Sequence, residues 1–239
     1  MLTLVLTRHG LTDRSIPEQH IGQRIDISIN AAGRRQAETL GRRLARVRFD
    51  RVITSPLFRA RETALLAMAA VPAEADPRLK EMDYGAWEGR TYEEVRAEDA
   101  KLREEWEAAP DTTHCPGGES GNQVAARVDR FLTDLLVEQR TWHAKAQFRA
   151  AAGGRTMGGR APEEPPERRV LVVGHATTNR ILISVALGVD IRGYRRRFAQ
   201  DQCNLTVLRW DAAGVPAAAK LLLLNDSQHL RATDAPPWG

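Results

Sequence analysis

Two histidines stand at matching places in the sequence, each close after a short apolar run. His9 follows the run 2–7 in Leu-Thr-Arg-His-Gly, and His175 follows the run 170–173 in Val-Val-Gly-His. An imidazole can act as nucleophile, base or acid near neutral pH. A single histidine after a strand is most often structural. Two in matching positions favour a shared site, because ligands of α/β sheets bind beyond the carboxyl ends of the strands.

Two arginines lie in the first turns of the helix expected after Ser55-Pro56. Helix N-termini attract anions and disfavour cations, so Arg59 and Arg61 indicate a bound negative group. For one of the two, the alternative is a solvated arginine paired with Glu62. The chain has 35 basic residues and a net charge of +4, and nearly all of its basic residues are arginine. That bias suits an anionic substrate or nucleic acid, and genome composition would explain it equally well.

A repeated strand and helix pattern predicts the framework that positions these residues. Apolar runs at 2–7, 51–54 and 170–173 predict strands, and each is followed by a helical pattern. Asn30 is the expected N-cap of the first helix, and Gly188 the stop of the third. This alternation favours an α/β domain with a mainly parallel sheet and helices on both faces. Further helices are expected at 91–108 and 120–142, and two closing strands at 205–210 and 218–224.

The length of 239 residues fits one domain, and we expect 1–239 to form a single unit. The segment 144–168 interrupts the pattern with Gly153-Gly154 and Pro165-Pro166, and its composition is that of a loop. Connections this long are uncommon inside compact domains. We expect a lid or a subunit contact there, and a passive surface excursion is the alternative.

The composition is that of an ordinary soluble globular protein, with 42% hydrophobic and 28% charged residues. We see neither a basic leader nor about 18 consecutive apolar residues, which would indicate export or a membrane span. Cys115 and Cys203 have no metal-type spacing, and a structural disulfide is not expected. We therefore expect a cytoplasmic protein without a membrane partner. No aromatic-interleaved basic patch or known nucleic-acid motif is present, so we expect no nucleic-acid partner either.

A set of motifs along nearly the whole chain, apart from the Gly/Pro insert, resembles the histidine phosphatase superfamily, which includes the phosphoglycerate mutases. The motifs occur in the order usual for that family. The resemblance implies a three-layer α/β/α sandwich of the phosphoglycerate mutase type. The motifs are Arg8-His9-Gly10, Ser55-Pro56-x-x-Arg59-Ala60-Arg61-x-Thr63-Ala64, Leu79-x-Glu81, Gly85-x-Trp87-Glu88-Gly89, Gly117-Gly118-Glu119-Ser120 and Gly174-His175.

The resemblance also implies roles for individual residues. His9 would attack the phosphoryl group and become a phosphohistidine, while Arg8, Arg59 and His175 hold the phosphoryl oxygens. This arrangement requires no metal and no cofactor. Gln23 matches a family position that lines the phosphate site.

Glu81 matches the family's proton donor, a role that a carboxyl with a raised pKa performs best. Asp83 and Glu88 are the alternatives for this role, and Glu88 is expected to order its loop instead.

The expected function is a metal-independent phosphatase, a phosphoric monoester hydrolase acting on a small phosphorylated metabolite. The first alternative is a phosphoglycerate mutase, but the longer signature of a true mutase after Arg8-His9-Gly10 is not present. The second alternative is a non-catalytic binding or regulatory module, which the intact set of family positions disfavours. A homodimer is compatible with the sequence, and the alcohol part of the substrate is not named by it.

Overall fold

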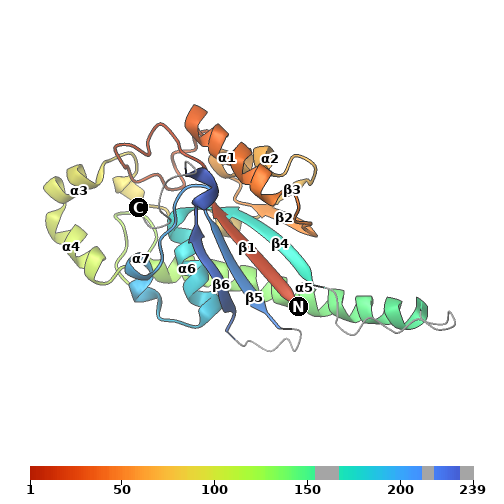
Figure 1. Cartoon of the computed structure of the whole chain (residues 1–239). Coiled ribbons are helices and arrows are strands. Elements are labelled where there is room, and N and C mark those ends of the chain that lie inside the picture. Colours follow the sequence, from red (N-terminus) through yellow and green to blue (C-terminus); the bar gives the residue numbers. More distant parts are fainter. Residues whose placement is uncertain (154–166, 212–217, 232–239) are drawn as a thin grey trace.

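The computed structural model describes residues 1–153, 167–211 and 218–231. Within these ranges six strands form one sheet in the order β3-β2-β4-β1-β5-β6 (Figure 1). The strands β3, β2, β4 and β1 run parallel, while β5 is antiparallel to β1 and to β6. The bounds are β1 (Leu2–Arg8), β2 (Arg51–Thr54), β3 (Ala73–Ala75), β4 (Arg168–Gly174), β5 (Leu205–Trp210) and β6 (Lys220–Asp226).

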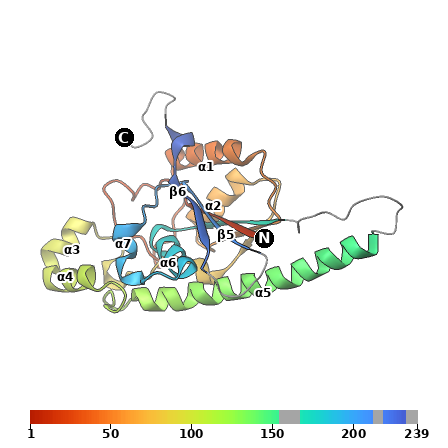
Figure 2. The ribbon, with the colours of Figure 1, turned by 60° about the horizontal axis from the view of Figure 1, so that its bottom comes forward.

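Helices cover both faces of this sheet, as Figure 2 shows. On one face lie α1 (Ala31–Leu44) and α2 (Phe58–Ala67), which pack on Val5, Leu171 and their neighbours. On the other face lie α5 (Gly121–Gly153) and α6 (Ala176–Leu187), which pack on Leu4, Leu6 and Val172. Successive strand residues point to opposite faces, so a strand covered on both sides must be apolar throughout. The α/β/α sandwich expected from the sequence is therefore confirmed, with a mixed sheet in which the central strands are parallel.

Local signals fix several helix ends. The Asn30 side chain accepts a hydrogen bond from the Gly33 N–H and caps α1, and Gly188 closes α6 with a left-handed φ of 65°. The helix expected from Ser55-Pro56 starts later, at Phe58, because residues 55–57 turn outward from β2 first. The Ser55 hydroxyl instead accepts a bond from the Leu57 N–H at 3.3 Å.

The connection from β3 to α5 forms a cap at one end of the sheet (Figure 1). The helix expected at 91–108 is divided at Asp99 into α3 (Tyr92–Glu98) and α4 (Ala100–Ala108). Buried Trp87 and Trp106 pack edge to face between the cap elements, with their ring centroids 5.8 Å apart. The remaining short helices are η1 (Pro77–Leu79), η2 (Gly85–Trp87), η3 (Ile191–Gly193), α7 (Tyr194–Arg197) and η4 (Gln228–Leu230).

The segment 144–168 differs from the expected loop. Its first part, up to Gly153, continues α5, since the alanine-rich stretch after residue 143 holds no breaker before Gly153. Residues 154–166 lie outside the described ranges, and β4 begins at Arg168. The single-domain expectation and the proposed lid or subunit role of this segment stay predictions.

Three further observations concern the described part of the chain. Cys115 and Cys203 are free and buried. Among the described residues, no helix is long and apolar enough to cross a membrane. The same part of the chain contains no group of three or more histidine, cysteine or acidic side chains placed to hold a metal ion.

Candidate active site

Adjacent strands β1 and β4 place the two histidines side by side. The register pairs Arg8 with Gly174, so His9 and His175 both follow at the same carboxyl edge of the sheet. The His9 N–H donates to the Gly174 carbonyl at 3.0 Å, and the two imidazole centroids are 5.2 Å apart. The sheet edge expected to carry a site therefore brings both histidines together.

The His9 ring is held with one nitrogen occupied and one free. Its Nδ1 lies 2.7 Å from the Gly10 carbonyl oxygen, which can only accept, so Nδ1 carries the proton and Nε2 keeps its lone pair. Burial lowers the pKa of His9 well below its usual 6.5, and the positive charges of Arg59 and Arg8 lower it further. A neutral imidazole with a free Nε2 is the form that attacks phosphorus.

Gly10 has to be a glycine for this geometry. A Cβ at position 10 would lie 2.6 Å from the Gly33 carbonyl oxygen at the start of α1. The Gly10 N–H donates to the Thr63 hydroxyl of α2 at 3.0 Å. The carbonyl that orients His9 is thus fixed between α1 and α2.

Positive charge surrounds His9 from two elements. Arg59 is fully buried, and its guanidinium donates to the carbonyl oxygens of Ile21, Gly22 and Ile25. Arg8 donates through Nη1 to the Gln200 carbonyl at 2.9 Å. Within the described residues, neither arginine has a carboxylate within ion-pair distance.

His175 completes this group from α6, where it occupies the N-cap position. It is fully buried, and neither of its ring nitrogens has a hydrogen-bond partner among the described residues. A buried polar atom without a partner is costly, and an oxygen of an anion beside the two rings would accept a hydrogen bond from the His175 N–H. Burial, together with nearby positive charge, lowers the pKa of His175 well below 6.5.

Glu81 reaches the site from the loop after η1. Its carboxyl accepts hydrogen bonds from the backbone N–H groups of Met82, Thr177 and Thr178, at 2.9 to 3.1 Å. Thr177 and Thr178 belong to the first turn of α6, where N–H groups have no partner inside the helix and favour negative charge. This position beside His9 sets Glu81 apart from the other acidic residues of its loop.

Asp83 and Glu88, the alternatives to Glu81, are engaged elsewhere. Asp83 pairs with Arg24 at 3.0 Å. Glu88 accepts bonds from three successive backbone N–H groups, those of residues 23–25. Glu88 therefore orders a loop, as expected, but that loop is the one at residues 23–25 and not its own.

Gln23 is directed away from the histidine pair. Its amide donates to the Glu119 carboxylate at 3.1 Å, and it does not line the hollow at His9. Its proposed contact with phosphate therefore requires a different side-chain arrangement from this one.

The hollow above His9 brings together Arg8, His9 and Glu81, while Arg59 and His175 are buried beside them. It also includes residues that the sequence had not singled out. They come from the loop after β1, from the cap, and from α6 and α7, and they include Arg14, Tyr84, Tyr92, Arg180 and Arg195. Arg180 could have been found, because it lies in the second turn of the helix that His175 begins. Arg195 could not, because α7 gives no clear pattern.

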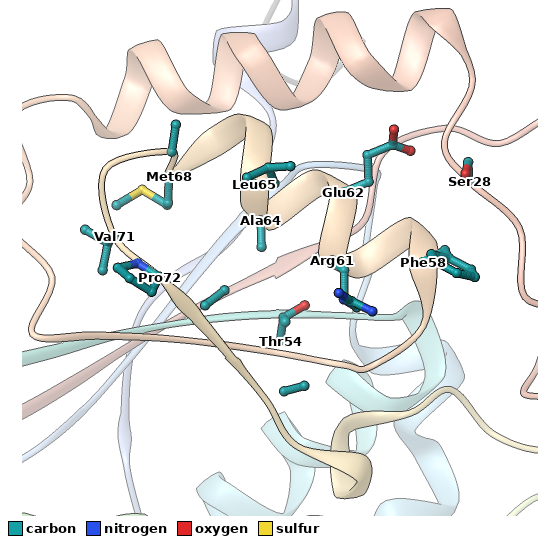
Figure 3. Close-up of a pocket in the computed structure, with 13 residues that line it drawn as sticks. Ser28, Thr54, Phe58, Arg61, Glu62, Ala64, Leu65, Met68, Val71 and Pro72 are labelled. Carbon is teal, nitrogen blue, oxygen red and sulfur yellow. The ribbon is translucent and has the colours of Figure 1, made fainter.

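A second and larger hollow, of about 510 Å³, lies between α2 and the edge of the sheet formed by β2 and β3 (Figure 3). Arg61 and Glu62 point to different sides of α2 there (Figure 3). Glu62 forms its ion pair with Arg34 of α1, so the expected pairing with Arg61 is replaced. Of the two arginines expected near an anion, Arg59 alone faces the histidines.

Comparisons with known proteins identify a family that covers most of the chain. A sequence model described as the histidine phosphatase superfamily (branch 1) matches residues 4–144 and 144–222. A bifunctional protein of Mycobacterium tuberculosis is 31% identical over 230 residues, which are 95% of this chain and 54% of that protein. The chain thus spans about half the length of this curated relative.

Two further similar proteins are matched over a larger share of their own length. The glucosyl-3-phosphoglycerate phosphatase of Mycobacterium tuberculosis is 32% identical over 179 residues, which are 72% of this chain and 69% of that one. The crystal structure of a putative alpha-ribazole-5'-P phosphatase from Escherichia coli superimposes with a TM-score of 0.72 at 26% identity. That match covers 94% of this chain and 96% of the other.

Proposed function

The chain belongs to the histidine phosphatase superfamily, branch 1, and from that premise we propose that it is a metal-independent phosphatase acting on a small phosphomonoester. The observation that carries this proposal is the state of His9, whose Nδ1–H is held by the Gly10 carbonyl while Nε2 is free beside His175. Related phosphatases of small phosphorylated compounds support it.

In the first step the Nε2 lone pair of His9 attacks phosphorus. The P–N bond forms, the ester P–O bond breaks, and protonated Glu81 gives its proton to the leaving alkoxide. The N–H groups of Met82, Thr177 and Thr178 then stabilise the carboxylate that this transfer leaves behind. The product is an alcohol and a phosphohistidine.

In the second step a water molecule takes the place of the alcohol. The Glu81 carboxylate removes one proton as the water oxygen bonds to phosphorus, and the P–N electron pair returns to Nε2 of His9. Arg8, Arg59 and His175 hold the phosphoryl oxygens, where charge resides in a loose transition state. Removal of one such donor should raise the barrier by about 3 kcal/mol.

The test compares His9→Ala with His114→Ala, a matched change at an exposed histidine of the loop before α5. With para-nitrophenyl phosphate, His9→Ala should release phosphate at least about a thousandfold more slowly, since it removes the nucleophile. His114→Ala should retain the wild-type rate. Full activity of His9→Ala would overturn the proposal.

A second assay separates hydrolysis from transfer to another hydroxyl group. With 3-phosphoglycerate as substrate, we expect release of inorganic phosphate to outpace formation of 2-phosphoglycerate. The opposite ratio would make the chain a mutase.

A further inference from the structure

The hollow above His9 contains more positive charge than a phosphomonoester needs. Four arginines line it, namely Arg8, Arg14, Arg180 and Arg195, against the two carboxylates of Glu18 and Glu81. Arg59 adds a fifth positive charge beside His9. Even when both carboxylates are counted as charged, the surplus of three positive charges exceeds the two negative charges that a phosphomonoester carries at neutral pH.

Arg180 and Arg195 line this hollow from α6 and α7. Among the described residues, no carboxylate lies within ion-pair distance of either guanidinium. Glu18, an exposed carboxylate of the lining, hydrogen-bonds to Tyr92, and the carboxylates that act on Arg180 and Arg195, those of Glu81 and Glu107, form no ion pair with them. The positive charge of Arg195 acts on Arg180, so the two guanidinium groups are near each other, and within the described residues neither is in an ion pair.

Each of these side chains is anchored so that donors remain free. Arg180 donates through Nε to the Phe198 carbonyl at 2.8 Å, which leaves its two Nη groups available. Arg195 stacks on the Trp106 ring of α4, with its guanidinium carbon 4.5 Å from the ring centroid. A stacked or tethered guanidinium loses little conformational freedom when it binds an oxyanion. Arg180 and Arg195 are therefore held in place before a ligand binds, with donor groups still free.

Contacts on both sides of Arg195 fix the position of α7. Tyr194 and Phe198, on either side of the three successive arginines, are buried in the core. Arg192 donates through Nε to the Ala108 carbonyl at the end of α4, which ties this turn to the cap. Burial and the positive charges of Arg8 and Arg195 also lower the pKa of Arg180, as expected for cations held together.

We propose that Arg180 and Arg195 form a subsite for a second anionic group, so the alcohol part of the substrate carries a carboxylate or a second phosphate. The proposal rests on the proposed phosphatase function. It narrows the substrate class from phosphomonoesters in general to those whose leaving alcohol is itself negatively charged. Phosphate esters with a neutral alcohol would leave both guanidinium groups without a partner.

The experiment uses pairs of compounds that differ in the second charge. 3-Phosphoglycerate and glycerol 3-phosphate differ by a carboxylate in place of a hydroxymethyl group. Fructose 1,6-bisphosphate and fructose 6-phosphate differ by one phosphate. The inhibition constant of each compound is measured against hydrolysis of para-nitrophenyl phosphate, so that turnover of the compound is not required.

In the wild-type chain, the more charged member of at least one pair should bind about tenfold to hundredfold more tightly, as expected for charge-assisted hydrogen bonds. The pair with the larger ratio identifies the second group as carboxylate or phosphate. In Arg195→Gln and in Arg180→Gln that ratio should fall towards one. Arg196→Gln changes an exposed arginine on the same helix and should keep the wild-type ratio.

Two results would overturn the subsite. One is a ratio near one for both pairs in the wild-type chain. The other is an equal loss of affinity for both members of a pair in the variants, which would mean that the arginines act on the reacting phosphate or on the fold. Either result with His9-dependent activity intact leaves the proposed function standing. Absence of any hydrolysis by the wild-type chain would instead reject the proposed function, and the subsite with it.

Discussion

Glu81 differs from its acidic neighbours in what surrounds the carboxyl, since three backbone N–H groups point at it from its own loop and from α6. A glutamine at this position keeps one acceptor oxygen, which can still accept from the Met82 and Thr178 N–H groups, and loses the transferable proton. The Glu81→Gln substitution can therefore distinguish a role as proton donor from a purely structural role of this carboxyl.

For Glu81→Gln we expect kcat with glycerol 3-phosphate to fall about hundredfold or more, the usual contribution of a general acid. The loss with para-nitrophenyl phosphate should be smaller, because nitrophenolate leaves without needing a proton. Steady-state kinetics with both esters measure the difference. Glu93→Gln, an exposed change on α3, is the control and should leave both rates unaltered. Equal losses for the two esters would argue against proton donation by Glu81.

Among the site residues, the sequence predicts those that directly follow a recognisable strand. His9 and His175 end apolar runs, and parallel pairing of β1 and β4 is enough to bring them together. Arg195 lies in a four-residue helix whose position depends on burial of Tyr194 and on Trp106, some 90 residues earlier in the chain. No local pattern encodes such a contact, so Arg195 could be recognised only in the folded molecule.

Among the elements, α1 has a direct connection to the catalytic loop. Its N-cap residue Asn30 accepts from the Gly33 N–H at 2.9 Å, and the Asn30 N–H donates to the Leu11 carbonyl at 2.8 Å. The same turn of helix leaves no room for a side chain at Gly10. The first turn of α1 therefore has two roles. Asn30 caps the helix, and the backbone around Gly33 fixes the position of Gly10, whose carbonyl orients His9.

Asn30→Ala should lower the free energy of unfolding by about 1 kcal/mol, the usual cost of losing a side-chain N-cap. Urea unfolding followed by circular dichroism measures this loss. Asn122→Ala, at an exposed position in the first turn of α5, is the matched control and should change stability by less than about 0.5 kcal/mol. A loss in Asn30→Ala no larger than in this control would contradict the capping role.

Element types could be predicted better than element ends. The strands β1, β2 and β4 and the helices that follow them match the apolar patterns, because burial on both faces imposes those patterns. The strands β5 and β6 also match apolar runs, although β6 is largely exposed. The division at Asp99 and the continuation of α5 to Gly153 could not be predicted. The first depends on packing of the cap around Trp87 and Trp106, and the second extends a helix beyond the part whose apolar residues face the sheet.

For the molecule as a whole, the cap has to be held in place over the sheet edge, because it carries Tyr92 and supports Arg195. His20, in the loop after β1, forms one of these links. Its Nδ1–H donates to the Arg90 carbonyl at 3.1 Å, and its Nε2 accepts from Arg103 of α4 at 2.8 Å. Arg103 in turn lies between the rings of Trp87, Tyr92 and Trp106. The bond from Arg103 requires the neutral imidazole, because a protonated Nε2 cannot accept it.

The link through His20 makes stability depend on pH with a defined sign. Burial lowers the pKa of His20 from 6.5 to about 4, and the positive charges of Arg103, Arg195 and Arg90 act in the same direction. Between these values the unfolded chain binds the proton at His20 and the folded chain does not, so His20 contributes a loss of stability of about 3 kcal/mol as pH falls from 6.5 to 4. The lowered pKa values of His9 and His175 act in the same direction. His20→Gln cannot take up this proton. It should be less stable than the wild type at pH 7, and the difference should shrink steadily towards pH 4. Urea unfolding across this range measures both chains, and a difference that stays constant with pH would show that His20 does not titrate on unfolding.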